Sequence, residues 1–205
     1  CRAEGCAVEV CYSAADAISI AERNPGKEVV FLAVGFETTT GPVVSLVDIA
    51  MRNRIRNVSL LTAFKLVPPA LTALLTDPEM KIDAFLCPSH VSAIIGANAY
   101  EPFVRQYRVP CVVAGFEPLD ILMSLVQILE QLVNNEAHLE NEYSRVVKPN
   151  GNPKAQQVIA RFLRPVDAVW RGIGLIPQSG LGLRPEFSDF DTAQRHGITL
   201  KPGMD

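Results

Sequence analysis

Four short polar motifs carry most of the residues in this sequence that could do chemistry. They are GFETTTG at 35–41, AFK at 63–65, CPSHVS at 87–92 and GFEPLD at 115–120. Each motif follows directly on a short apolar run of the kind that forms a buried β-strand. Because the carboxyl ends of parallel strands open onto one crevice, we expect the four motifs to converge at one place.

The first and fourth motifs place carboxylates where a strand turns into a helix. Glu37 is followed by Thr38 and Thr39, and Glu117 stands three residues before Asp120. These side chains could cap helix N-termini, where free N–H groups and the helix dipole favour oxygen ligands and negative charge. The same N–H groups and hydroxyls could instead bind an anion or position a ligand. Two carboxylates at neighbouring strand ends could also shift each other's pKa, which suits acid/base chemistry or metal contact.

The CPSHVS motif brings a thiol, an imidazole and two hydroxyls within six residues. Cys87 could be an ordinary strand residue, with Ser89 or His90 capping the next helix. Alternatively, a helix N-terminus lowers the pKa of a thiol, which would make Cys87 a thiolate and His90 a proton carrier or ligand. Both interpretations stay open from the sequence.

Two basic residues could belong to the same crevice. Lys65 follows the third apolar run and could neutralise the acids or hold an anion, or it could simply be solvated. Arg171 interrupts an apolar stretch beside the only tryptophan, so we expect it to pair with a carboxylate. His138 and His196 lie in polar surroundings and are expected at the surface.

Composition excludes several classes of protein. Apolar residues make up 48% and charged residues 20%, with a formal net charge of -3, so there is no basic surface for nucleic acid. The longest apolar runs fall far short of the roughly 20 residues that cross a bilayer. No Gly-Lys-Ser/Thr follows a glycine-rich loop and no G-x-G-x-x-G follows the first strand, so the usual nucleotide motifs are missing.

The five cysteines form no C-x-x-C pair, which is the usage of a reducing cytosol. Cys1, Cys6 and Cys11 are close in sequence, yet a five-residue step puts Cys6 and Cys11 on opposite faces of any strand. We therefore expect no metal site there.

Apolar runs alternate with amphipathic stretches, the pattern of repeated βα units. The sequence predicts an α/β fold with one open, mostly parallel sheet of about five strands and helices on both faces, plus a C-terminal helix and β-hairpin. The expected strands are 8–12, 29–34, 58–62, 84–86 and 110–114, and the expected helices are 13–23, 42–54, 68–75, 118–134 and 153–162. The hairpin should cover 166–183, with its turn at 177–180.

The division expected along the chain is an α/β domain over 1–148, which carries the motifs, and a helix, hairpin and tail over 149–205. That second part should pack on the first, or on an N-terminal domain outside this chain. A start at Cys1 rather than Met suggests a piece of a longer protein.

Read together, VVFLAVGFETT, KLVPPAL, FLCPSHVSAIIG, VVAGFEPLDIL and VWRGIGLIPQSGLGL resemble the hydrogenase maturation (formation) protein family HypD. The resemblance runs along essentially the whole chain, in order and without large gaps. It implies a cytoplasmic accessory protein for [NiFe]-hydrogenases. Members of the family are scaffolds on which iron receives cyanide and carbon monoxide as an Fe(CN)2CO group. They work with HypC-like and HypE-like partners and indirectly with the hydrogenase large subunit.

Carried onto this chain, the resemblance places the GFETT, CP-x-H and GFEPLD residues in the cleft where iron is built and a partner docks. It therefore implies catalytic roles for Glu37, Cys87, His90 and Glu117. The residues expected to contact the cofactor are Thr38, Thr39, Lys65, Asp120 and Arg171.

Two departures from the family pattern limit these expectations. Phe64 stands where the family often has His before the lysine. The N-terminal cysteine motifs and the C-terminal cysteines that bind a [4Fe-4S] cluster have no counterpart in this sequence. We therefore expect no metal ligands here. The alternatives are a free-standing thiol-dependent transferase or hydrolase using Cys87, His90 and Glu37, and a structural domain whose polar motifs only cap helices.

Overall fold

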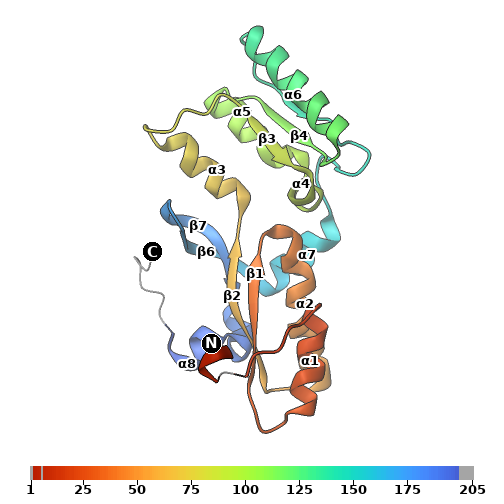
Figure 1. Ribbon diagram of the computed structural model, residues 1–205, viewed down its shortest axis with the longest axis vertical. Coiled ribbons are helices and arrows are strands. Elements are labelled where there is room, and N and C mark those ends of the chain that lie inside the picture. The colour runs from red at the N-terminus through yellow and green to blue at the C-terminus, as the bar shows by residue number, and fades with distance from the viewer. Residues whose placement is uncertain (1, 6, 199–205) are drawn as a thin grey trace.

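The computed structural model describes residues 2–5 and 7–198, and its architecture is α/β, as predicted (Figure 1). Helices and strands alternate along most of the chain. The strands are β1 (Val29–Gly35), β2 (Val58–Lys65), β3 (Phe85–Pro88), β4 (Cys111–Ala114), β5 (Leu139–Asn141), β6 (Leu163–Trp170) and β7 (Gly174–Leu183). The α-helices are α1 (Ala14–Arg23), α2 (Glu37–Asn53), α3 (Val67–Thr76), α4 (Ser89–Ile95), α5 (Glu101–Tyr107), α6 (Pro118–Val133), α7 (Pro153–Phe162) and α8 (Thr192–His196).

The strands form two sheets, which corrects the prediction of a single one. One sheet has the order β1-β2-β7-β6 and the other the order β3-β4-β5. The β1–β2 pair is parallel and β7 pairs antiparallel with β2, whereas the second sheet is parallel throughout. Because β7 occupies the second edge of β2, β3 cannot add there, and α3 carries the chain away to begin a separate sheet.

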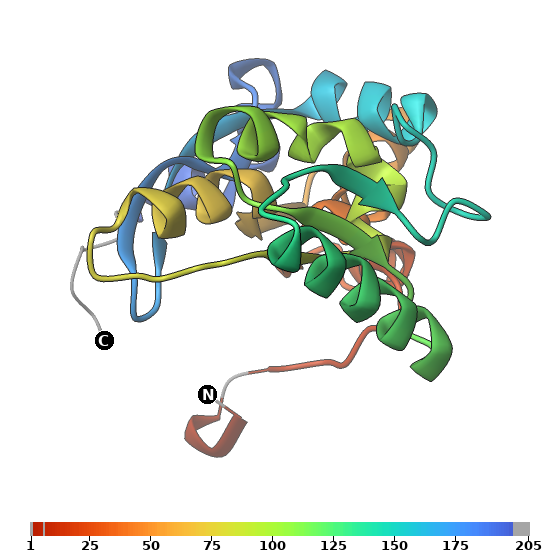
Figure 2. The ribbon, with the colours of Figure 1, turned by 90° about the horizontal axis from the view of Figure 1, so that it is seen from above.

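Each sheet has its own apolar core. The four-stranded sheet packs α1, α2 and α7 against one face, with Val44, Leu60, Phe64 and Phe162 almost fully buried. The three-stranded sheet lies between α5 on one side and α6 on the other (Figure 2). Its core surrounds Tyr100 and includes both Cys87 and Cys111.

The strand predicted at 8–12 is wrong. These residues form no strand, and the side chains of Val8, Val10 and Tyr12 are exposed. An alternating pattern becomes a strand only where a neighbouring strand supplies hydrogen-bond partners. The 8–12 segment does not add to the free edge of β1 and pairs with no other strand of the described residues.

Helix α2 begins at Glu37, five residues before the predicted start. The GFETT motif is therefore the first turn of a helix, and Pro42 lies inside it. The proline removes one backbone hydrogen bond. Two hydroxyls bond to carbonyls of this turn, since Thr39 Oγ1 donates to Phe36 O and Thr40 Oγ1 donates to Glu37 O.

The hairpin exists, but its turn lies at 171–173 rather than at 177–180. Gly172 and Gly174 have φ values of 78° and 95°, which supply the left-handed conformations that a tight reversal needs. The predicted turn residues Pro177 and Gln178 lie instead within β7, opposite a register shift between Val166 and Ala168.

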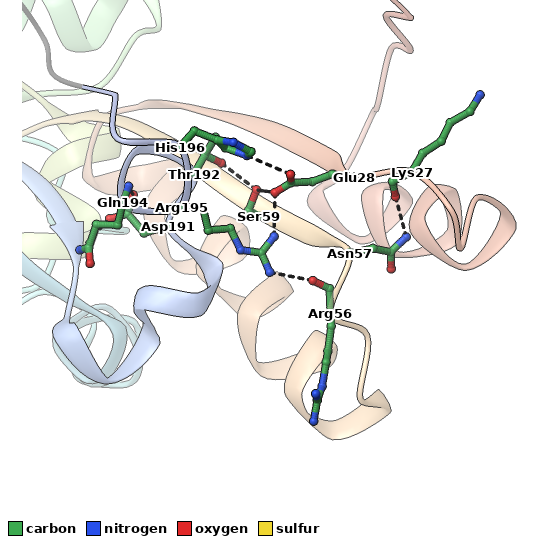
Figure 3. Close-up of polar contacts among 10 residues, drawn as sticks. All are labelled: Lys27, Glu28, Arg56, Asn57, Ser59, Asp191, Thr192, Gln194, Arg195 and His196. Atoms are coloured by element: carbon green, nitrogen blue, oxygen red, sulfur yellow. Dashed lines mark hydrogen bonds and ion pairs between the residues drawn. The ribbon is translucent and has the colours of Figure 1, made fainter.

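At the end of the four-stranded sheet opposite the motifs, polar contacts fasten α8 (Figure 3). Glu28 accepts hydrogen bonds from Arg195 at 2.7 Å and Ser59 at 3.1 Å, and lies 2.9 Å from His196 Nε2. Thr192 Oγ1 donates to Ser59 Oγ at 2.8 Å. The two histidines predicted at the surface, His138 and His196, are 61% and 48% exposed at their side chains. Within 2–5 and 7–198, no helix is long and apolar enough to cross a membrane.

Candidate functional site at the strand ends

Glu37 is a buried carboxyl group, and only one of its two oxygens is hydrogen-bonded to another described residue. It is the first residue of α2 and only 3% exposed. Its Oε1 accepts a hydrogen bond of 2.8 Å from the N–H of Val67, which ties the end of β1 to the start of α3. Its Oε2 is buried and has no partner among the described residues. Burial raises the pKa of Glu37, because removal from water disfavours the charged form.

The threonines of the same motif differ in their surroundings. Thr39 is exposed and Thr38 half-buried. A Cβ at Gly35 would lie 2.0 Å from Thr39 Oγ1, so only glycine allows this approach between strand end and helix. The threonine hydroxyls described above donate to carbonyls instead of accepting from N–H groups, so the expected N-capping is not what they do.

Lys65 is anchored to the hairpin instead of solvated. Its Nζ donates to the carbonyl of Val169 at 2.7 Å and lies 5.8 Å from the centre of the Trp170 ring. Burial lowers the pKa of Lys65. The Trp170 ring also lies 6.1 Å from Phe36 of the first motif. The hairpin therefore joins the ends of β1 and β2 into one surface.

Cys87 lies inside the core of the second sheet, with its thiol beside that of Cys111. It is 1% exposed, and a hydrogen bond with Cys111 together with burial raises its pKa well above the ordinary value. The surroundings of Cys87 therefore favour the neutral thiol over the thiolate. A nucleophilic cysteine needs an electropositive, partly open site, and Cys87 has neither property.

His90 is exposed on the first turn of α4, where its ring lies 4.6 Å from that of Phe116. This contact brings the CPSHVS and GFEPLD motifs side by side. The expectation that Glu37 and Glu117 lie at neighbouring strand ends is wrong, because β1 and β4 belong to different sheets. Ser89, the residue before it, is buried with a hydroxyl that has no partner among the described residues.

Glu117 and Asp120 share one arginine that the sequence analysis did not identify. Arg145 Nη2 donates to Asp120 Oδ2 at 2.5 Å and lies 3.5 Å from Glu117 Oε2. The guanidinium also stacks 4.0 Å from the centre of the Tyr143 ring. The only sequence signal is that Arg145 is the first Lys or Arg after Arg108.

The Asp120–Arg145 contact should make stability depend on pH in the acid range. The Arg145 hydrogen bond holds the pKa of Asp120 below its usual range. The stabilisation is therefore complete above the unfolded pKa of about 3.9 and is lost as pH falls through the lower folded value. We expect Asp120→Asn to flatten this acid limb in urea unfolding measured at several pH values. Asp77→Asn, on an exposed loop, is the control. If both variants show the same loss of stability as pH falls, the Asp120–Arg145 contact is not its cause.

Tyr100 is a buried residue beside the CPSHVS motif that was not identified from the sequence. Its hydroxyl is buried and lies 3.1 Å from Ser92 Oγ. The pKa of Tyr100 is raised, first by burial, then by Cys87 and also by Glu37. Cys87 lies in β3, whereas Glu37 begins α2 directly after β1. The sequence around 97–100 contains no signal that singles out Tyr100.

Arg171 does not belong to this group. It lies in the exposed turn between β6 and β7 and makes no ion pair with any carboxylate of the described residues. The prediction that it pairs with an acid is wrong because the hairpin turn places it at the tip, where water solvates the guanidinium.

The described residues do not fit a resident metal group. Within this part of the chain, no three His, Cys, Asp or Glu side chains gather as a metal site would require. A [4Fe-4S] cluster takes four thiolates, whereas Cys87 and Cys111 are two buried thiols in an apolar core. Cys1 and Cys6 lie outside the described residues.

Comparison with known proteins gives a consistent relationship along the whole chain. Residues 1–204 match the HypD family, described as "Hydrogenase formation hypA family". The "Hydrogenase maturation factor HypD" of Cupriavidus necator is 42% identical over 212 residues, covering all of this chain and 56% of the relative. That of Azotobacter vinelandii is 40% identical, covering all of this chain and 55% of the relative.

An archaeal protein belongs to the same set of relatives. The "Putative hydrogenase expression/formation protein" of Methanocaldococcus jannaschii is 39% identical over 96% of this chain and 55% of the relative. The chain thus spans about half the length of the curated relatives it matches.

Proposed function

Because the chain belongs to the HypD family of hydrogenase formation proteins, we propose that it is part of an accessory scaffold for [NiFe]-hydrogenase maturation. The match along the whole chain is the observation that carries this proposal. In it, the scaffold acts in the cytoplasm and helps assemble an Fe(CN)2CO group, with iron as the cargo. HypC-like and HypE-like proteins are its partners, and the hydrogenase large subunit receives the product.

The strand-end residues divide into a buried and an exposed part under this proposal. Glu37 is the buried part, and its open Oε2 can hold a proton at pH values where an exposed carboxyl would be ionised. His90, Glu117 and Arg145 are the exposed part, available to a docking partner or its cargo. Thr38, Thr39 and Lys65 lie at the end of the four-stranded sheet. This separation suits a scaffold that presents a surface more than an enclosed catalytic pocket.

The geometry disfavours the alternative function, a thiol-dependent transferase or hydrolase. Such an enzyme needs a nucleophile within hydrogen-bond reach of its base. The Cys87 thiol contacts Cys111 instead, and His90 contacts Phe116. The rival proposal thus lacks both an ionised sulfur and a base beside it.

A chimera tests the proposed function. The matching part of the Cupriavidus necator relative is replaced by this chain, and the chimera is returned to a strain that lacks its own HypD protein. We expect hydrogenase activity of the same order as with the intact relative. A chimera that accumulates in folded form but restores no activity would contradict the proposal.

A variant of the chimera tests the exposed part of the site. We expect His90→Ala to reduce the infrared bands of iron-bound cyanide on the purified scaffold, because it removes the imidazole at the junction of two motifs. His138→Ala, which alters a histidine of similar exposure away from the strand ends, is the control. Unchanged bands in His90→Ala would remove this residue from the chemistry.

A further inference from the structure

Helix α6 carries an apolar face that points away from the protein. Leu119, Leu122, Leu129 and Val133 are 69%, 60%, 59% and 84% exposed. Single exposed apolar residues are ordinary, but a contiguous apolar face marks an interaction surface. The complete outward face consists of Leu119, Leu122, Met123, Leu125, Val126, Leu129, Leu132 and Val133.

Polar contacts fix the rotation of α6 and prevent it from turning this face inward. The side of α6 that meets the sheet carries Asp120, Ser124 and Gln131, all buried. Gln131 Nε2 donates to Glu140 at 2.9 Å, and Gln131 Oε1 accepts from the N–H of His138 at 2.6 Å. Rolling the helix would break these bonds and the contact between Asp120 and Arg145. The exposed apolar face is therefore a stable feature of the fold.

The spacing of the outward residues suits another helix. Leu119, Leu122, Val126, Leu129 and Val133 follow one another at alternating intervals of three and four residues. This is the a/d spacing along which two helices pack side by side. The 16 residues of α6 provide about two such repeats.

The charges around this face select the kind of helix. Residues 109–145 contain six acids, Glu117, Asp120, Glu130, Glu136, Glu140 and Glu142, and one Lys or Arg, Arg145, which pairs with Glu117 and Asp120, so the net charge of this segment stays acidic. Glu130 and Glu136 are exposed at the C-terminal end of α6, and Glu130 has no ion pair among the described residues. Two copies of α6 would bring like charges together, whereas a basic helix would neutralise them.

We propose that the outward face of α6 docks a helix of another protein, with an apolar stripe against Leu122 and Leu129 and Lys or Arg on its flanks. Apolar contact supplies the affinity, and the acidic surroundings supply the choice of partner. The inference goes beyond the proposed maturation role and does not depend on it.

Two synthetic 16-residue peptides test the docking surface. Both carry leucines at a/d spacing, one with lysines on the flanks and the other with glutamates. Fluorescence anisotropy should show the lysine peptide binding this chain at least about tenfold more tightly, with the difference shrinking as salt rises. Equal binding of both peptides, or binding of neither, would overturn the proposal.

Matched variants locate the binding. Leu122→Gln with Leu129→Gln should weaken the lysine peptide about tenfold or more. The control is Leu32→Gln with Val34→Gln, which removes two apolar side chains of similar exposure, 66% and 67%, from β1. Circular dichroism checks that both variants fold. Equal losses in the two variants would overturn the assignment to α6.

The remaining outcomes identify other occupants. A dimer in light scattering that the α6 variant dissociates would make a second copy the occupant. Binding to this chain but not to the full-length chimera would mean that the rest of the longer protein covers α6. Either result would overturn the proposal. Because the assay requires no hydrogenase, neither affects the maturation role.

Discussion

Replacing Gly96 with alanine is expected to lower the free energy of unfolding by about 3 kcal/mol or more. Gly96 ends α4 with φ at 91°, a conformation that side chains rarely adopt. A Cβ there would lie 2.3 Å from the carbonyl oxygen of Pro149 and 2.6 Å from the nitrogen of Gly151. Both contacts are with backbone, which cannot swing aside as a flexible side chain would. Urea unfolding measures the loss.

Gly41→Ala is the matched control for this prediction. Gly41 lies inside α2, and a Cβ there would meet nothing within 4 Å. Because Pro42 disfavours a helical residue with a Cβ directly before it, which offsets the better helix propensity of alanine, we expect this variant to change the free energy of unfolding by less than about 1 kcal/mol. Similar small changes in both variants would show that the junction at Gly96 is looser than described.

The junction at Gly96 holds the Tyr100 region in place. The N–H of Ala97 and that of Asn98 donate to the carbonyls of Lys148 and Pro149, at 3.2 and 3.0 Å. A shift of this segment would move Tyr100 away from Ser92. Gly96→Ala in the chimera should therefore reduce hydrogenase maturation together with stability.

Glu37→Gln is expected to abolish maturation in the chimera while leaving the fold at least as stable at neutral pH. Glutamine keeps an oxygen that can accept the Val67 N–H bond, but it cannot take up or release a proton. An ionised carboxylate with an unpartnered buried oxygen costs more than a neutral amide in the same place. Hydrogenase activity and thermal unfolding, measured on the same preparations, separate the two effects.

The pH dependence gives a second readout for Glu37. Its folded pKa is raised by burial, so the folded state binds the proton more tightly than the unfolded chain. The resulting stabilisation is complete below the unfolded pKa of about 4.3 and is lost as pH rises through the folded value. Relative to Glu37→Gln, the unmodified protein should therefore lose stability over that rise.

Glu117→Gln provides the comparison, since Glu117 is an exposed carboxylate whose side chain is 56% accessible. We expect Glu117→Gln to leave unchanged the loss of stability that occurs as pH rises through the folded pKa of Glu37. If Glu37→Gln matures hydrogenase as well as the unmodified chimera does, the carboxyl group has no part in the chemistry. If the unmodified protein and Glu37→Gln show the same dependence of stability on pH, the raised pKa of Glu37 is contradicted.

Local patterns in the sequence determined the α/β class and most of the elements. The apolar runs at 29–34, 58–62 and 110–114 became β1, β2 and β4, and the periodic stretch at 118–134 became α6. Adjacent parallel strands also brought His90 to Phe116. These features depend on side-chain periodicity and on short connections, which the sequence contains directly.

Strand pairing and burial were decided only by the tertiary structure. β7 took the edge of β2, so five expected parallel strands became two sheets, and 8–12 found no partner. Cys87 lies beside Cys111, and Asp120 beside Arg145, because of contacts between distant segments. The sequence by itself determined the residue types of the four motifs and the strand after which each motif lies. The tertiary structure decided their protonation and partners, because pKa and pairing depend on burial and on neighbours brought from elsewhere in the chain.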